Sequence, residues 1–116
     1  MKHLFVLNDA PYGNERPYNA LRLARGLLKP GSEEVKLFLI GDAVACAKAG
    51  QKVPQGYYNA GDMLRMIARQ GAEVGVCGTC IDARGIAETE LVEGARRGTM
   101  DGLIGWTLWA DRVMVF

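Results

Sequence analysis

The chain has 116 residues, of which 49% are hydrophobic and 23% charged, a composition typical of a globular domain and not of a disordered or fibrous chain. Its 14 basic and 13 acidic residues nearly cancel and form no basic stripe, so we expect no nucleic-acid partner. No apolar run approaches the roughly 20 residues of a membrane span, and the N-terminal run is too short for a signal peptide. We therefore expect a cytoplasmic protein with no membrane partner.

Strand-like and helix-like patterns alternate along the chain. Strands are expected where short apolar runs end in polar residues or glycine, and helices where apolar residues recur at helical spacing. In chain order the patterns predict a strand at 2–7, a helix at about 19–28, a strand at 35–40, a weak helix at 42–49, an amphipathic helix at 60–69, a strand at 74–77, a weak helix at 88–97, a short strand near 97–99, a weak helix at 100–109 and a strand at 113–116.

This alternation predicts βαβ units, and the nearly continuous apolar character of the strands indicates a mainly parallel sheet covered by helices on both faces. The expected fold is therefore a three-layer α/β/α sandwich that forms a single domain over residues 1–116. Ligands of such sheets meet the carboxyl ends of the strands. The informative loops are thus those after Leu7, Ile40 and Cys77.

Three cysteines occur in the chain, Cys46, Cys77 and Cys80. An odd number in a short chain fits a reducing compartment with thiol chemistry better than a secreted disulfide scaffold. A zinc site would need a fourth ligand, and only His3 could supply one, so we expect no metal. Cys46 lies among apolar residues of a predicted helix, where core packing explains it best.

The segment after the third long strand holds the strongest candidate for chemistry. Thr79 and Asp82 have the spacing of a capping pair, which would open a short helix with Cys80 at its first position. The helix amides there would favour a thiolate, and Arg84, four residues on, would add a cation on the same face. We therefore predict that Cys80 is the reactive residue, with Arg84 assisting it.

The role of Cys77 stays open between packing within an apolar strand and chemistry. A Cys-x-x-Cys pair can serve dithiol redox exchange, although in thioredoxins the motif follows the first strand and here it follows the third. A disulfide would also require Cys77, on its strand, to turn its sulfur toward Cys80.

The loop at residues 8–17 leaves the first strand at the same edge of the sheet and is longer than an ordinary βα connection, which suggests a pocket wall or subunit contact. We assign Asn8, Tyr12 and Gly13 of this loop to substrate binding, together with Thr79 and Asp82. Neither G-x-G-x-x-G nor G-x-x-x-x-G-K-[ST] occurs, so no nucleotide or other cofactor is expected.

Several segments together carry a family resemblance: NDAPYG at 8–13, LFLIGDAV at 37–44, GQK at 50–52, CGTC at 77–80 with Asp82 and Arg84-Gly85, and WTL at 106–108 with ADRV at 110–113. In this order they resemble the DsrE/DsrF-like family, most closely its YchN-like branch. The resemblance covers nearly the whole chain. It implies a parallel five-stranded sheet and assembly as trimers or hexamers.

The resemblance also implies sulfur chemistry. In the sulfur-relay relatives one cysteine after the third strand carries a persulfide, and its place in the pattern matches Cys80, whereas Cys77 is a departure from those relatives. The first hypothesis is therefore a sulfur carrier or sulfurtransferase that works with donor and acceptor proteins. The alternatives are a non-catalytic oligomeric module that binds a small molecule or partner, and a Cys77–Cys80 dithiol redox protein.

Overall fold

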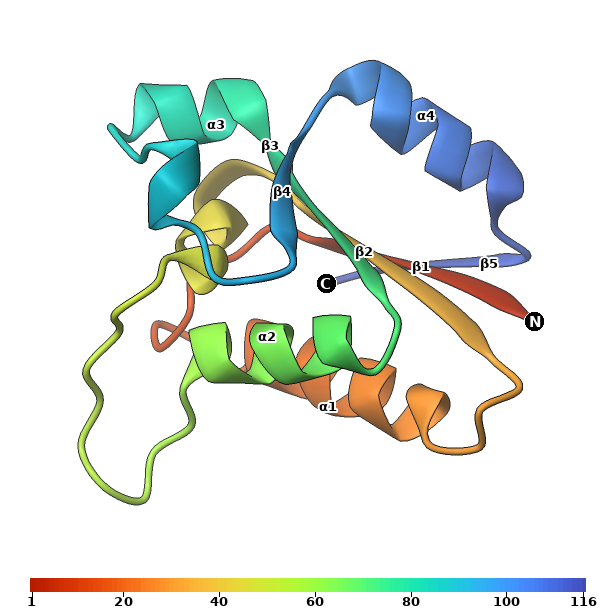
Figure 1. The fold of residues 1–116 in the computed structure, drawn as a ribbon, viewed down its shortest axis with the longest axis horizontal. Helices are drawn as coiled ribbons and strands as arrows, with labels where there is room; N and C mark the ends of the chain where they lie inside the picture. The colour runs from red at the N-terminus through yellow and green to blue at the C-terminus, as the bar shows by residue number, and fades with distance from the viewer.

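Five parallel strands form the central sheet of the computed structural model, which describes residues 1–116 (Figure 1). Along the sheet the strand order is β4-β3-β2-β1-β5, and every neighbouring pair is parallel. The strands are β1 (Lys2–Leu7), β2 (Glu34–Leu39), β3 (Glu73–Cys77), β4 (Ala95–Gly98) and β5 (Arg112–Val115). The predicted five-stranded parallel sheet is therefore confirmed.

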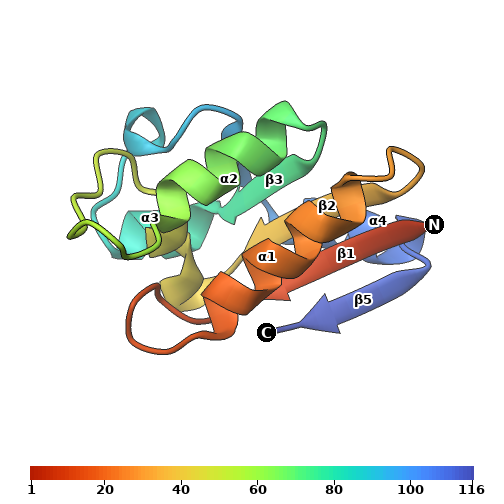
Figure 2. The ribbon, with the colours of Figure 1, turned by 90° about the horizontal axis from the view of Figure 1, so that it is seen from below.

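Helices lie on both faces of this sheet, as Figures 1 and 2 show from two directions. Helices α1 and α2 cover one face, and α4 lies over the other, which gives the predicted three-layer α/β/α arrangement. The short helices α3 and η1 gather at the carboxyl ends of the strands. The helices are α1 (Arg16–Leu28), η1 (Gly41–Ala47), α2 (Ala60–Arg69), α3 (Gly78–Ala83), η2 (Glu88–Glu90) and α4 (Met100–Trp109).

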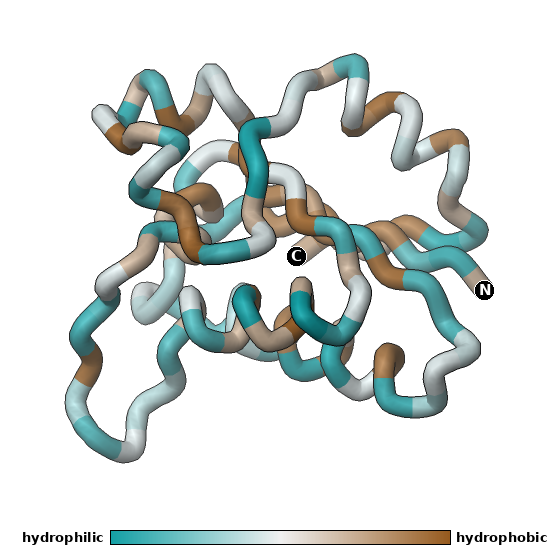
Figure 3. The backbone as a smooth tube through the Cα atoms, in the orientation of Figure 1, coloured by the Kyte–Doolittle hydropathy of each residue, from teal (hydrophilic) through white to brown (hydrophobic).

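The hydrophobic core lies between the sheet and the layer formed by α1 and α2. Phe5, Leu37 and Val74 stand in register on three neighbouring strands and are buried there. From the helices, Leu21 and Leu64 reach the same core and are fully buried. Each such side chain contributes about 1.5–3 kcal/mol by leaving water. The apolar colouring of the central strands in Figure 3 follows this core.

The face under α4 is covered more thinly. No residue of α4 is buried, and Ile104 and Leu108 are exposed apolar side chains of this helix. Trp106 is half-buried and meets Phe38 of β2 edge-to-face, with ring centroids 6.1 Å apart. No helix of the structure has both the length and the apolar character needed to cross a membrane.

Two sequence predictions differ from the structure. The helix predicted at 88–97 is wrong, because the segment holds only the short turn η2 and then the strand β4. Gly94 has φ of +90°, which no right-handed helix accommodates, and the residues after it pair with β3. The segment predicted as a helix at 42–49 is a 3-10 helix that begins at Gly41 and ends at Ala47.

Candidate functional site

The carboxyl ends of β1, β2 and β3 bring Asn8, Gly41 and Cys77 to one edge of the sheet. Gly41 has φ of +59°, a left-handed conformation that glycine adopts without strain. In this conformation its backbone N–H donates to Cys80 Sγ, 3.2 Å away. A residue of the β2–η1 junction therefore supplies a hydrogen-bond donor to the cysteine predicted to react.

Cys77 forms the N-cap of α3, the helix that follows β3. Its Sγ accepts a hydrogen bond from the Cys80 N–H at 3.3 Å and lies 3.4 Å from Thr79 Oγ1. The prediction that Thr79 caps this helix is therefore wrong, since α3 begins at Gly78 and the cap is the cysteine one position earlier. Thr79 instead points its hydroxyl at the Cys77 sulfur.

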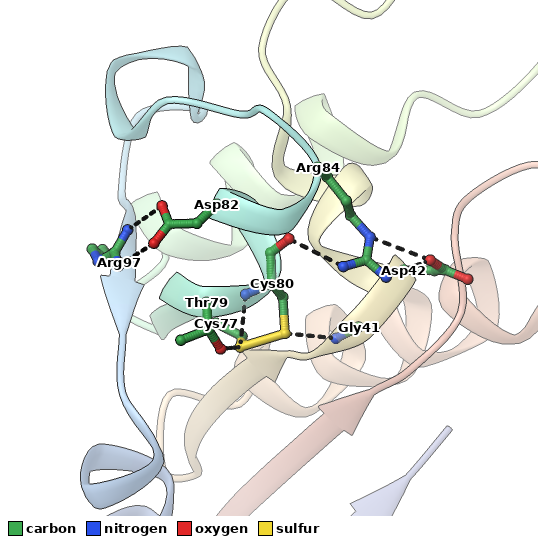
Figure 4. The surroundings of a disulfide bond; sticks show 8 residues. All are labelled: Gly41, Asp42, Cys77, Thr79, Cys80, Asp82, Arg84 and Arg97. Carbon is green, nitrogen blue, oxygen red and sulfur yellow. Dashed lines mark hydrogen bonds and ion pairs between the residues drawn. A yellow bond between two sulfur atoms is a disulfide. The ribbon is translucent and has the colours of Figure 1, made fainter.

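The two sulfurs of Cys77 and Cys80 are joined in a disulfide (Figure 4). Their Cα atoms are 5.2 Å apart, within the usual range for a disulfide. The expected obstacle, that Cys77 sits on its strand and must turn toward Cys80, is absent because Cys77 is the last residue of β3 and already faces the first turn of α3. The structure thus makes Cys77 a partner of Cys80.

We expected the Arg84 guanidinium to lie beside the Cys80 sulfur, but it contacts a carboxylate and a backbone carbonyl instead. Its guanidinium donates to the backbone carbonyl of Cys80 at 3.1 Å and to Asp42 Oδ1 at 2.7 and 3.3 Å (Figure 4). Arg84 therefore ties α3 to η1 and holds the Gly41 turn against the disulfide. The sequence patterns did not single out Asp42, which the structure places in contact with Arg84.

Asp82 lies on the opposite side of α3 and forms a bidentate ion pair with Arg97 of β4, at 2.8 and 2.9 Å. The Arg97 guanidinium holds the pKa of Asp82 below its ordinary value, and the carboxylate raises the pKa of Arg97. Gly78 leaves room for this pair, because a Cβ there would lie 2.7 Å from the guanidinium. Asp82 thus fastens α3 to the edge strand.

A half-enclosed cavity of about 190 Å³ opens beside Cys77. Its wall combines apolar side chains, two threonines and the paired arginine, and Cys77 contributes to it while Cys80 does not. The lining residues are Phe38, Ile40, Cys77, Gly78, Thr79, Arg97, Gly98, Thr99 and Met100.

Of the other residues predicted to bind substrate, Asn8 lies beside Gly41, and its side-chain amide donates to the Phe116 carbonyl at 3.2 Å. Tyr12 turns toward the loop before α2, where its hydroxyl contacts Gln51 Oε1 and accepts from the Ala60 N–H at 3.2 Å. These contacts hold Tyr12 at φ of 74°, and burial raises its pKa.

Gly13 is exposed, and a Cβ built on it would meet no atom within 4 Å. Tyr12 borders a separate hollow of about 460 Å³ with Val53, Pro54 and Tyr57. Thr79 thus contacts the disulfide, whereas Asn8 contacts the C-terminal residue Phe116 and Tyr12 contacts the loop before α2.

The third cysteine takes no part in this site. Cys46 is fully buried, and burial raises the pKa of its thiol to about 12. Its sulfur lies 3.7 Å from the Asp9 carbonyl, and its neighbours belong to the hydrophobic core. Core packing, as predicted, accounts for Cys46. Nowhere does the structure group three or more His, Cys, Asp or Glu side chains in an arrangement that could hold a metal ion.

Together the sheet and the cysteine pair define a parallel α/β protein with a disulfide at the carboxyl end of its third strand. The chain belongs to the DsrE/DsrF-like family, whose sequence profile matches residues 1–116. It is 43% identical to protein YchN of Escherichia coli K12 over 116 residues, which cover 99% of this chain and 98% of YchN. It is 45% identical to an uncharacterised protein, MK0008, of Methanopyrus kandleri over 111 residues, 96% of this chain and 90% of that one.

A solved structure agrees with this assignment. The crystal structure of the E. coli ychN protein matches with a TM-score of 0.94 and 42% identity over 100% of this chain and 99% of that one. A protein of unknown function from Bacteroides thetaiotaomicron, BT1422, matches with a TM-score of 0.70 at 14% identity, covering 98% of this chain and 94% of that one. The second likeness shows only a shared fold.

Proposed function

We propose that this protein carries sulfane sulfur on Cys80 and that Cys77 is its resolving thiol. The observation that carries the proposal is the pairing of the two sulfurs, since a resolving thiol at Cys77 must reach Cys80 Sγ and the disulfide joins these two atoms. The link of the DsrE-like family to sulfur relay supports the same chemistry.

Loading begins from the reduced protein. The Cys80 thiolate attacks the outer sulfur of a donor persulfide, a new S–S bond forms, and the donor leaves as a thiolate. The Gly41 N–H, 3.2 Å from Cys80 Sγ, stabilises the negative charge on this sulfur. The ion pair between Arg84 and Asp42 keeps that amide in place, because it joins η1 to α3.

The carried sulfur can leave in two ways. An acceptor thiolate can attack the outer sulfur, which forms the acceptor persulfide and returns the Cys80 thiolate. Alternatively, the Cys77 thiolate attacks Cys80 Sγ and expels hydrosulfide, which leaves the Cys77–Cys80 disulfide. The second route ends in the bonded pair that the structure contains.

A dithiol redox role is the second candidate, and the same disulfide favours it. In that case the pair exchanges two electrons with a partner dithiol and holds no extra sulfur. The two candidates differ in whether a persulfide donor adds a sulfur atom to the reduced protein.

Mass spectrometry of the reduced protein after incubation with a persulfide donor tests the proposal. The wild type should gain one sulfur atom and then lose it as the disulfide forms. The Cys77→Ser variant should keep the adduct longer because it has no resolving thiol, and Cys80→Ser, the matched control, should gain none at this site. If neither the wild type nor Cys77→Ser gains sulfur while the disulfide still cycles, the redox role replaces the carrier. If the pair neither gains sulfur nor cycles, a non-catalytic binding module remains.

A further inference from the structure

The cavity of about 190 Å³ is lined by one of the two cysteines of the disulfide. Cys77 belongs to its wall, whereas the Cys80 sulfur is turned toward the Gly41 amide, outside the cavity lining (Figure 4). A molecule inside the cavity therefore meets the disulfide at Cys77.

The walls of this cavity select for an apolar ligand. Phe38, Ile40 and Met100 contribute apolar surface, and the only cation in the lining, Arg97, is bound through two nitrogens to Asp82. Because the guanidinium is already paired with a carboxylate, it attracts a free anion less strongly than an unpaired arginine would.

Two hydroxyls add limited polarity to the wall. Thr99 Oγ1 already accepts the Gly102 N–H at 3.1 Å as the cap of α4, and Thr79 Oγ1 lies against the Cys77 sulfur. The volume sets the ligand size, because a dry cavity of about 150 Å³ binds benzene. The cavity beside Cys77 thus suits a compact molecule of about the size of a substituted aromatic ring.

We propose that a low-molecular-weight thiol with a compact apolar group occupies this cavity and reduces the disulfide by attack at Cys77. The thiol gives its proton to solvent and forms an S–S bond with Cys77 Sγ, while the Cys77–Cys80 bond breaks and Cys80 leaves as a thiolate. A second thiol then attacks the mixed disulfide at the sulfur of the bound thiol. The products are a free small-molecule disulfide and the reduced protein, so two thiols are oxidised for each disulfide reduced.

Binding in the cavity, and not leaving-group stabilisation, decides which sulfur is attacked. The Cys80 sulfur accepts the Gly41 N–H at 3.2 Å, and the Cys77 sulfur accepts the Cys80 N–H at 3.3 Å, so each would be stabilised as a leaving thiolate. Of the two cysteines, Cys77 alone is among the residues that line this cavity, where a small thiol can bind before it reacts.

This inference rests on the disulfide that the proposed carrier cycle produces, and it supplies the step that regenerates the carrier. Sulfur donors and acceptors would react at Cys80, and the small reductant would react at Cys77. The two sulfurs of one pair would then serve two different kinds of molecule.

Trapping the mixed disulfide tests the proposal on the wild-type protein. Oxidised protein is mixed with benzenethiol, quenched in acidic maleimide and analysed by peptide mass spectrometry. We expect benzenethiol on Cys77 and maleimide on Cys80. The reverse labelling, or no reduction by benzenethiol, would overturn the proposal.

A pair of variants on α4 tests the cavity itself. Met100→Trp narrows the cavity and should slow reduction by benzenethiol roughly tenfold, equivalent to about 1.4 kcal/mol of activation free energy. Reduction by hydrosulfide, which needs little space, should be almost unchanged. Leu108→Trp places the same indole at a highly exposed position of the same helix, outside the cavity lining, and should change neither rate.

If Met100→Trp leaves the benzenethiol rate unchanged, or slows both reductants equally, the cavity does not admit the thiol. Failure of the carrier proposal gives a different result, because the reduced protein then gains no sulfur from a persulfide donor while benzenethiol still labels Cys77.

Discussion

Replacing Gly41 by alanine tests whether the backbone N–H at this position raises the reduction potential of the Cys77–Cys80 disulfide. A non-glycine residue in its left-handed conformation costs roughly 1–2 kcal/mol. The added Cβ would lie 3.9 Å from the Asn8 carbonyl oxygen, an ordinary contact, so backbone strain and not a clash is the direct cost. In the wild type the N–H nitrogen lies 3.2 Å from Cys80 Sγ. We expect the strained turn of the variant to relax by moving this N–H away from the sulfur.

The expected change in reduction potential follows from the lost hydrogen bond. A hydrogen bond to a charged group contributes about 1.5–3 kcal/mol. If the Cys80 thiolate loses about 1.4 kcal/mol more stabilisation than the disulfide sulfur does, the potential of the pair becomes about 30 mV more negative, because a charged sulfur accepts this hydrogen bond more strongly than a neutral one. Equilibration in glutathione buffers, followed by alkylation and mass spectrometry, measures this shift.

Gly31→Ala is the matched control. Gly31 has φ of +75° and lies between α1 and β2, where a Cβ would meet no atom within 4 Å. Both variants should lose about 1–2 kcal/mol of unfolding free energy in urea, since both place alanine in the left-handed region. Only Gly41→Ala should shift the potential. If both variants keep the wild-type potential, the Gly41 amide does not stabilise the Cys80 thiolate.

Two further predictions follow from groups outside the site. The Met1 ammonium at 2.8 Å and His3 at 2.9 Å lower the pKa of Glu33 to about 2, so Glu33 stabilises the fold above pH 4.5 and loses this effect as the pH falls toward 2. The difference in unfolding free energy between wild type and Glu33→Gln should shrink over this range in urea titrations, and a constant difference would contradict the linkage. In the oxidised protein Cys46 is the only free thiol, and because burial raises its pKa to about 12 it should react with a thiol reagent at neutral pH only on unfolding. Rapid labelling of the folded protein would show that Cys46 is accessible.

Much of the fold could be predicted because its determinants are local. The apolar run at residues 2–7 matches β1 (Lys2–Leu7), and the apolar runs of β2, β3 and β5 predict those strands to within one residue at either end. The edge strand β4 was predicted only in part, as a short strand near 97–99, because Arg96 and Arg97 show no apolar pattern. Their strand conformation comes from pairing with β3 after the turn at Gly94.

The sequence patterns alone indicate a parallel α/β domain that resembles the DsrE/DsrF-like family, with two cysteines at the end of its third long strand. The tertiary structure decided how those cysteines are used. Gly41 is 39 residues from Cys80, and Arg97 is 15 residues from Asp82, so no local pattern reveals either contact. Only the folded sheet brings the Gly41 amide to one sulfur and a cavity to the other, because parallel strands place distant loops at one edge.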